Sequence, residues 1–92
     1  MFNDEKINDL RNEIEKITIK IIKLCMERLM LVKEIGKIKT QKSLPIENLQ
    51  IEMKLKKKVD LLCKKYAVDS ISYLKILEIL LIESKKIQKE IM

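Results

Sequence analysis

The chain contains no histidine or tryptophan, and its 92 residues include one glycine, one proline, two cysteines, two tyrosines and one phenylalanine. Without histidine, neither Cys–His nor Ser–His nucleophilic catalysis is available, and two cysteines alone cannot form a zinc site. The composition is 47% hydrophobic and 37% charged, which is typical of long helices rather than of a β-sandwich or barrel. We therefore expect one small helical domain over residues 1–92 that binds no metal.

Other absences bear on location and partners. Two cysteines without a disulfide pattern are typical of free thiols in a reducing compartment. Residues 1–9 lack the apolar run of a signal peptide, and the most apolar run, residues 79–82, is too short to span a membrane. The net charge is +6, but the lysines of residues 54–65 alternate with apolar positions and few aromatics are present for base stacking. We expect a cytoplasmic protein with no membrane segment and no nucleic-acid partner.

Arginine is scarce among the basic residues, since only Arg11 and Arg28 accompany the lysines that make up the rest of the 20. The planar guanidinium binds a carboxylate through two parallel hydrogen bonds and keeps its charge when buried. Arg28 also occupies an apolar seam position, and a charge that faces a core needs a partner. That partner is an anionic ligand in one interpretation. In the other, Arg28 reaches solvent at the seam edge or pairs with an internal glutamate.

Apolar residues at three- and four-residue steps predict three helices. These span about residues 4–39, 46–66 and 70–91, with a polar loop at 40–45. Pro45 fits the first turn of the second helix, and Asp69 or Ser70 fits the cap of the third. The first helix would be about 50 Å long at 1.5 Å per residue. A domain this small cannot cover such a helix, so we expect a second chain to do so.

Each predicted helix carries a polar interruption in its apolar stripe. Arg28 interrupts the first stripe and Glu52 lies in line with the second. The third stripe ends in Ser84 and Gln88. Interruptions on all three helices indicate a polar pocket inside a helical bundle, where bundles usually build their sites. The alternative is that each of these residues lies at a partly exposed edge.

Several segments occur in an order typical of a known family. They are residues 10–17 (LRNEIEKI), Arg28 with residues 35–39 (IGKIK), residues 44–48 (LPIEN) with Glu52, and Ser84 with Gln88. In this order the chain resembles the all-helical, type II chorismate mutase family over nearly its whole length. It departs from the family at Asn48, commonly Asp, at Ile51, commonly Arg, and at Thr18, usually acidic. Ile51 matters most, because the missing arginine helps to order the site, so lower affinity or altered substrate preference is implied.

The resemblance implies a fold and a reaction. The fold is all-α, with one long and two shorter helices per chain in an intertwined helical-bundle homodimer. The reaction is the pericyclic rearrangement of chorismate to prephenate in aromatic amino-acid biosynthesis. It needs no nucleophile, proton transfer, metal or cofactor, only orientation and electrostatics. Two alternatives stay open: a related lyase that removes pyruvate from isochorismate, and a non-catalytic helical dimerisation module.

The resemblance also implies a role for each of seven side chains. Arg28 with Ser84 would bind one substrate carboxylate, Arg11 the other, Lys39 and Gln88 the ether oxygen, and Glu52 with Asn48 the ring hydroxyl. Arg11 and Arg28 are separated by about 25 Å along one helix, so they cannot hold the same small molecule. Two antiparallel first helices that cross near residues 19 and 20 would bring Arg11 of one chain beside Arg28 of the other. The expected homodimer then has two sites shared between its chains.

Overall fold

The computed structural model describes residues 2–91, which form three α-helices and no β-strand. Helix α1 comprises Phe2–Gln41, α2 comprises Leu49–Lys65 and α3 comprises Ser70–Ile91. The prediction of an all-helical chain with one long and two shorter helices is confirmed. Residues 1 and 92 of the predicted domain lie outside the described range. None of the three helices has a stretch that is both apolar and long enough to cross a bilayer.

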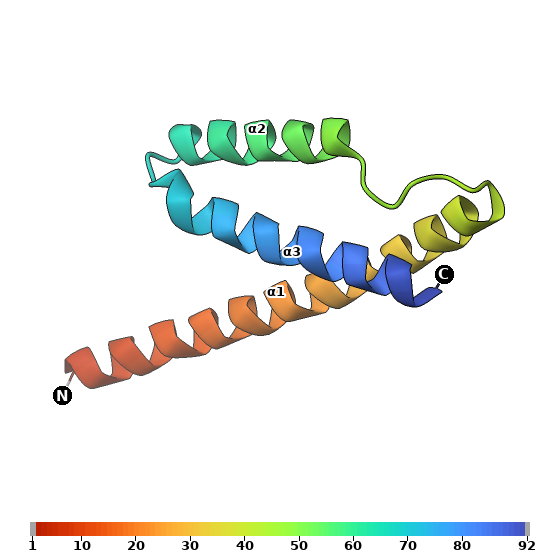
Figure 1. The fold of residues 1–92 in the computed structure, drawn as a ribbon. Helices are drawn as coiled ribbons and strands as arrows, with labels where there is room; N and C mark the ends of the chain where they lie inside the picture. The colour runs from red at the N-terminus through yellow and green to blue at the C-terminus, as the bar shows by residue number, and fades with distance from the viewer. Residues whose placement is uncertain (1, 92) are drawn as a thin grey trace.

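Helix α3 is the element on which the other two pack (Figure 1). The C-terminal half of α1 crosses α3, and α2 forms a hairpin with α3, whereas α1 and α2 do not pack on each other. The N-terminal half of α1 extends away from both. The radius of gyration is 17.6 Å, against about 12 Å for a compact chain of this length. The single chain is therefore elongated rather than globular.

Burial within the described residues is sparse. The buried hydrophobic residues are Val32, Cys63 and Leu77, and no large side chain is completely buried. The polar Ser84 and Gln88 are as deeply buried as these three. By contrast, the seam of α1 between residues 7 and 24 remains 42–61% exposed. These seam residues are Ile7, Leu10, Ile14, Ile17, Ile21 and Leu24. The chain alone thus leaves its longest apolar stripe uncovered.

Helices α1 and α2 each end in a hydrogen-bonded turn of the same type. The bonds run from the N–H groups of Ser43 and Leu44 to the carbonyls of Thr40 and Lys39, and from those of Ala67 and Val68 to the carbonyls of Lys64 and Cys63. This pattern is the Schellman motif, which satisfies carbonyls at a helix end. Its turning residues, Ser43 (φ 55°) and Ala67 (φ 54°), occupy the left-handed region that glycine usually fills. Both chain reversals are therefore made without glycine.

Helix α2 begins at Leu49, three residues later than expected. Asn48 has an extended backbone and its Oδ1 accepts a hydrogen bond from the Ile51 N–H at 3.2 Å, so Asn48 is the N-cap. The expectation that Pro45 lies in the first turn of this helix is wrong, because the asparagine cap sets the start and leaves the proline in the loop. At α3, Oδ1 of Asp69 accepts from the Ile71 N–H at 2.8 Å and provides the cap.

Candidate active site

A cavity of about 370 Å³ lies between the C-terminal half of α1, the start of α2 and the end of α3. Six of the seven side chains expected in the site line it: Arg28, Lys39, Asn48, Glu52, Ser84 and Gln88. The remaining lining is mostly aliphatic and includes Val32, Ile35, Ile46, Ile51, Leu55 and Leu81. The polar interruptions of the three apolar stripes therefore do meet around one space.

Arg28 is held in this cavity by one turn of α3. Its Nη1 donates to the Leu80 carbonyl at 3.1 Å and to Oγ of Ser84, while the Ser84 hydroxyl itself donates to the Leu80 carbonyl at 2.8 Å. Nε and Nη2 make no hydrogen bond to another described residue, and Arg28 forms no ion pair in that range. The free edge of the guanidinium has the fork geometry that binds a carboxylate.

Lys39 is tied to the loop that follows α1. Its Nζ donates to the Ile46 carbonyl at 2.7 Å, and its own carbonyl accepts from the Leu44 N–H at 2.8 Å within the Schellman turn. An ammonium group has three N–H donors, so two remain for a ligand. The turn at the end of α1 thus fixes the direction of the lysine side chain as well as the path of the loop.

Gln88 is 6% exposed and faces α1 at Gly36. Its Nε2 donates to the Ser84 carbonyl at 3.3 Å, and its Oε1 is buried with no partner among the described residues. The amide nitrogen carries a second N–H that is free to donate. A Cβ at position 36 would be 3.3 Å from Cγ of Gln88 and 3.1 Å from Cδ1 of Ile91. Glycine at this position avoids two tight contacts where α3 packs against α1.

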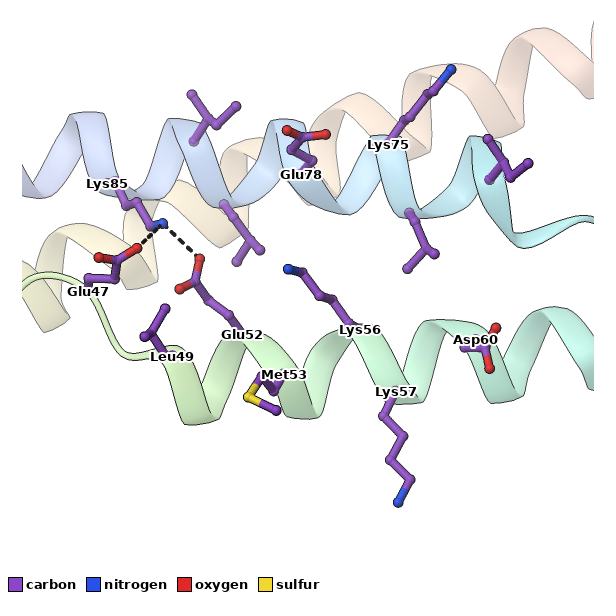
Figure 2. Close-up of a pocket in the computed structure, with 14 residues that line it drawn as sticks. Glu47, Leu49, Glu52, Met53, Lys56, Lys57, Asp60, Lys75, Glu78 and Lys85 are labelled. Atoms are coloured by element: carbon purple, nitrogen blue, oxygen red, sulfur yellow. Dashed lines mark hydrogen bonds and ion pairs between the residues drawn. The ribbon is translucent and has the colours of Figure 1, made fainter.

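Glu52 is joined to Lys85, a residue that the sequence pattern did not indicate. Oε1 of Glu52 lies 2.8 Å from Nζ of Lys85, which also lies 2.8 Å from Oε1 of Glu47 (Figure 2). The pKa of Lys85 is raised by its hydrogen bonds, most by the one to Glu47 and next by the one to Glu52. The hydrogen bond from Lys85 in turn lowers the pKa of Glu47. Lys85 was missed because position 85 lies beside the apolar stripe of α3 rather than on it.

Two of the expected site residues, Asn48 and Arg11, are less available than the others to a ligand in the cavity of this single chain. Asn48 lines the cavity, but its Oδ1 is already used as the cap of α2. Arg11 lies on the exposed N-terminal half of α1, about 25 Å from Arg28 along the helix. Within one chain the structure does not bring Arg11 to the cavity.

The cavity can bind and orient an anion. Arg28, Lys39 and Gln88 present free N–H donors, and Glu52 presents a buried oxygen, Oε2, that has no partner in the described range. Within residues 2–91, no three His, Cys, Asp or Glu side chains are grouped as a metal site. The arrangement suits a reaction that is accelerated by placing charges around a bound anion with a hydroxyl group.

Comparison with known proteins identifies the family. A family profile described as chorismate mutase type II matches residues 10–89. The chain belongs to this family. A chorismate mutase of Methanocaldococcus jannaschii is 36% identical over 86 residues, which cover 94% of this chain and 87% of that relative. No solved structure matches the chain with significance.

Membership of the chorismate mutase family makes the chain an enzyme, an isomerase. It confirms the resemblance carried by the ordered segments and the expected chorismate mutase activity. The isochorismate lyase and the non-catalytic module, both left open by the sequence, receive no support from these comparisons. The roles of individual residues and the shared site are taken up next as proposals.

Proposed function

We propose that the chain rearranges chorismate to prephenate in the cavity between α1, α2 and α3, as a step of aromatic amino-acid biosynthesis. The observation that carries this proposal is the set of unpaired donors around one small space. Three side chains that line the cavity have such donors. These donors are the free edge of the Arg28 guanidinium, two N–H bonds of Lys39 and one N–H bond of Gln88. Two free thiols, Cys25 and Cys63, support a cytoplasmic location.

The reaction breaks the ether C–O bond of chorismate and forms a C–C bond in the same step. Arg28, held by Ser84, binds one of the two substrate carboxylates. The ether oxygen gains negative charge as its bond breaks, and Lys39 and Gln88 stabilise that charge by donating to it. Oε2 of Glu52 accepts from the ring hydroxyl. Catalysis comes from holding the reacting carbons together and from this preorganised field.

The second carboxylate is bound by Arg11 of a second copy in a homodimer. Two features support the dimer: the apolar seam of α1 between residues 7 and 24 is uncovered, and Arg11 cannot reach the cavity of its own chain. Antiparallel packing of two α1 helices that cross near residues 19 and 20 covers the seam. The same packing completes each site with an arginine from the partner, in an intertwined bundle with two shared sites.

Product analysis with purified protein tests this function. Chorismate absorbance should fall on addition of the protein, and the product should be prephenate. Arg28→Ala, prepared in the same way, is the control for contaminating activity. Formation of salicylate and pyruvate from isochorismate without turnover of chorismate would identify a lyase instead, and no turnover of either compound would leave a non-catalytic module.

A further inference from the structure

The carboxylate of Glu52 lies in the wall between two cavities and forms one ion pair among the described residues, with Lys85. Glu52 and Lys85 both line the candidate active site and the larger groove between α2 and α3. The Glu52 side chain is 13% exposed, its Oε1 is paired with Lys85, and its Oε2 has no partner in the described part of the chain. A buried carboxylate with no counter-ion is unfavourable, so the position of this one depends on Lys85.

Lys85 is itself anchored from the opposite side. Glu47 belongs to the loop before α2, Glu52 to the first turn of α2 and Lys85 to α3, so the ammonium bridges segments that are distant in sequence (Figure 2). The bonds to two carboxylates restrict Nζ to the space between them. The oxygen of Glu52 that Lys85 does not bind is buried and has no partner in the described part of the chain.

We propose that Lys85 is a positioning residue for the mutase reaction and acts through Glu52. It fixes the carboxylate so that Oε2 accepts from the substrate hydroxyl, and it balances the Glu52 charge. The substrate, a dianion, then meets a carboxylate whose charge is partly offset by the ammonium that it shares with Glu47, rather than a bare anion. This inference rests on the proposed function, because it assigns Lys85 a part in the same site.

A different role is conceivable from the position of Lys85 alone. Because Lys85 also lines the cavity, its ammonium would attract a dianionic substrate directly, without help from Glu52. The two roles differ in one respect. If Lys85 acts through Glu52, its removal has no further effect once Glu52 has been replaced. If it attracts the substrate itself, the two losses multiply.

A double-mutant cycle with Lys85→Met and Glu52→Gln makes this distinction. We expect Lys85→Met to lower kcat/KM by about tenfold, as for loss of a hydrogen bond to a charged group. Most of the change should be in KM, since the hydroxyl is bound in the ground state and the transition state alike. Lys85→Arg should retain most of the efficiency. The double variant should be no less efficient than Glu52→Gln alone.

Lys75→Met is the matched control, because Lys75 lies on α3 as well and forms no ion pair with another described residue. It should stay within twofold of the parent in kcat/KM. Losses that multiply in the double variant, an unchanged Lys85→Met protein, or a Lys85→Arg protein as poor as Lys85→Met would each overturn the proposal.

The cycle also separates this inference from the proposed function. A parent protein that does not convert chorismate contradicts the function itself, whereas an active parent with multiplying losses contradicts only the role of Lys85. Circular dichroism shows whether each variant folds. If Lys85→Met does not fold, Lys85→Ala takes its place in the cycle, because it also removes the donor to Glu52.

Discussion

Gly36 of α1 and Gln88 of α3 approach so closely that a Cβ at position 36 would be 3.3 Å from Cγ of Gln88. A contact of this length requires the neighbour to move by a few tenths of an ångström. The same Cβ would be 3.1 Å from Cδ1 of Ile91, the far end of a flexible side chain. The single glycine of the chain therefore affects the position of the Gln88 side chain in the candidate site as well as the packing of two helices.

Gly36→Ala should separate activity from stability. Alanine is favoured over glycine within a helix by about 1 kcal/mol, which offsets the cost of the tight contacts. The displaced Gln88 amide should lower kcat by about tenfold, because small misplacements at a reacting centre are costly. The measurements are kcat and the urea midpoint, with the exposed Lys33→Ala as control. An unchanged kcat would show that Gln88 tolerates the displacement.

Arg28→Lys should lower kcat/KM by roughly a hundredfold, the usual size of effect for a preorganised donor at a reacting group. Lysine keeps the positive charge but cannot bond Ser84 and the Leu80 carbonyl while offering a two-pronged edge to a carboxylate. Steady-state kinetics on protein with an unchanged circular dichroism spectrum would measure the loss. A twofold decrease would mean that Arg28 contributes charge or packing only.

Gln88→Glu should make catalytic efficiency depend on the protonation of the new carboxyl group. The Gln88 amide donates at any ordinary pH, whereas a carboxyl donates only when protonated. An ionised carboxylate would also face the Ser84 carbonyl and the charge that develops on the ether oxygen. The variant should be nearly inactive at neutral pH and should recover as the pH falls. Parallel profiles of variant and parent, over a range where both stay folded, would exclude Gln88 as the donor.

Arg11→Ala and Arg28→Ala should each be nearly inactive, and a mixture of the two should recover activity. After random exchange of subunits, half of the dimers contain both variants and each of these has one intact site. The mixture should then reach about a quarter of the parent activity if the sites are shared. Each variant taken alone through the same exchange is the control. Absence of recovery, with exchange verified by mass spectrometry, would rule out the shared site.

Ala67→Gly should stabilise the protein by about 1 kcal/mol, because alanine at φ 54° carries a steric cost that glycine avoids. Urea unfolding at a fixed protein concentration would measure the change. Ser72→Gly, at an exposed position in the first turn of α3, is the control and should be destabilising. If both substitutions destabilise equally, the left-handed turn after α2 imposes no strain on alanine.

The helices and part of the site follow from apolar periodicity. The stripes predict which face of each helix is inward, and Arg28, Glu52, Ser84 and Gln88 stand out because they occupy stripe positions with polar groups. Lys39 and Asn48 carry no such signal, and the family resemblance alone indicated them. Both owe their place in the cavity to helix ends: Lys39 to the turn after α1, and Asn48 to the cap of α2.

Contacts between helices could not be predicted in this way. Both Pro45 and Asn48 are suited to the start of a helix, so local residue preferences did not determine which of them begins α2. In the structure Asn48 is the N-cap. The pairing of Lys85 with Glu52 depends on the relative position of α3 and α2 along their axes. The apolar periodicity of each helix carries no information on that position. The close approach at Gly36 is likewise a property of two helices together.

The free half of α1 acts mechanically as a lever whose pivot is the crossing with α3 (Figure 1). A tilt of about 10° at Arg28 moves Arg11 by about 4 Å, since roughly 25 Å of helix separates them. Arg28, close to the pivot, barely moves under the same tilt. If Arg11 binds a substrate carboxylate in a shared site, as proposed, its own helix alone therefore cannot fix its position. The surface on which the N-terminal end of α1 rests would have to fix that position, so residues remote from the cavity would control how Arg11 meets a substrate in the proposed dimer.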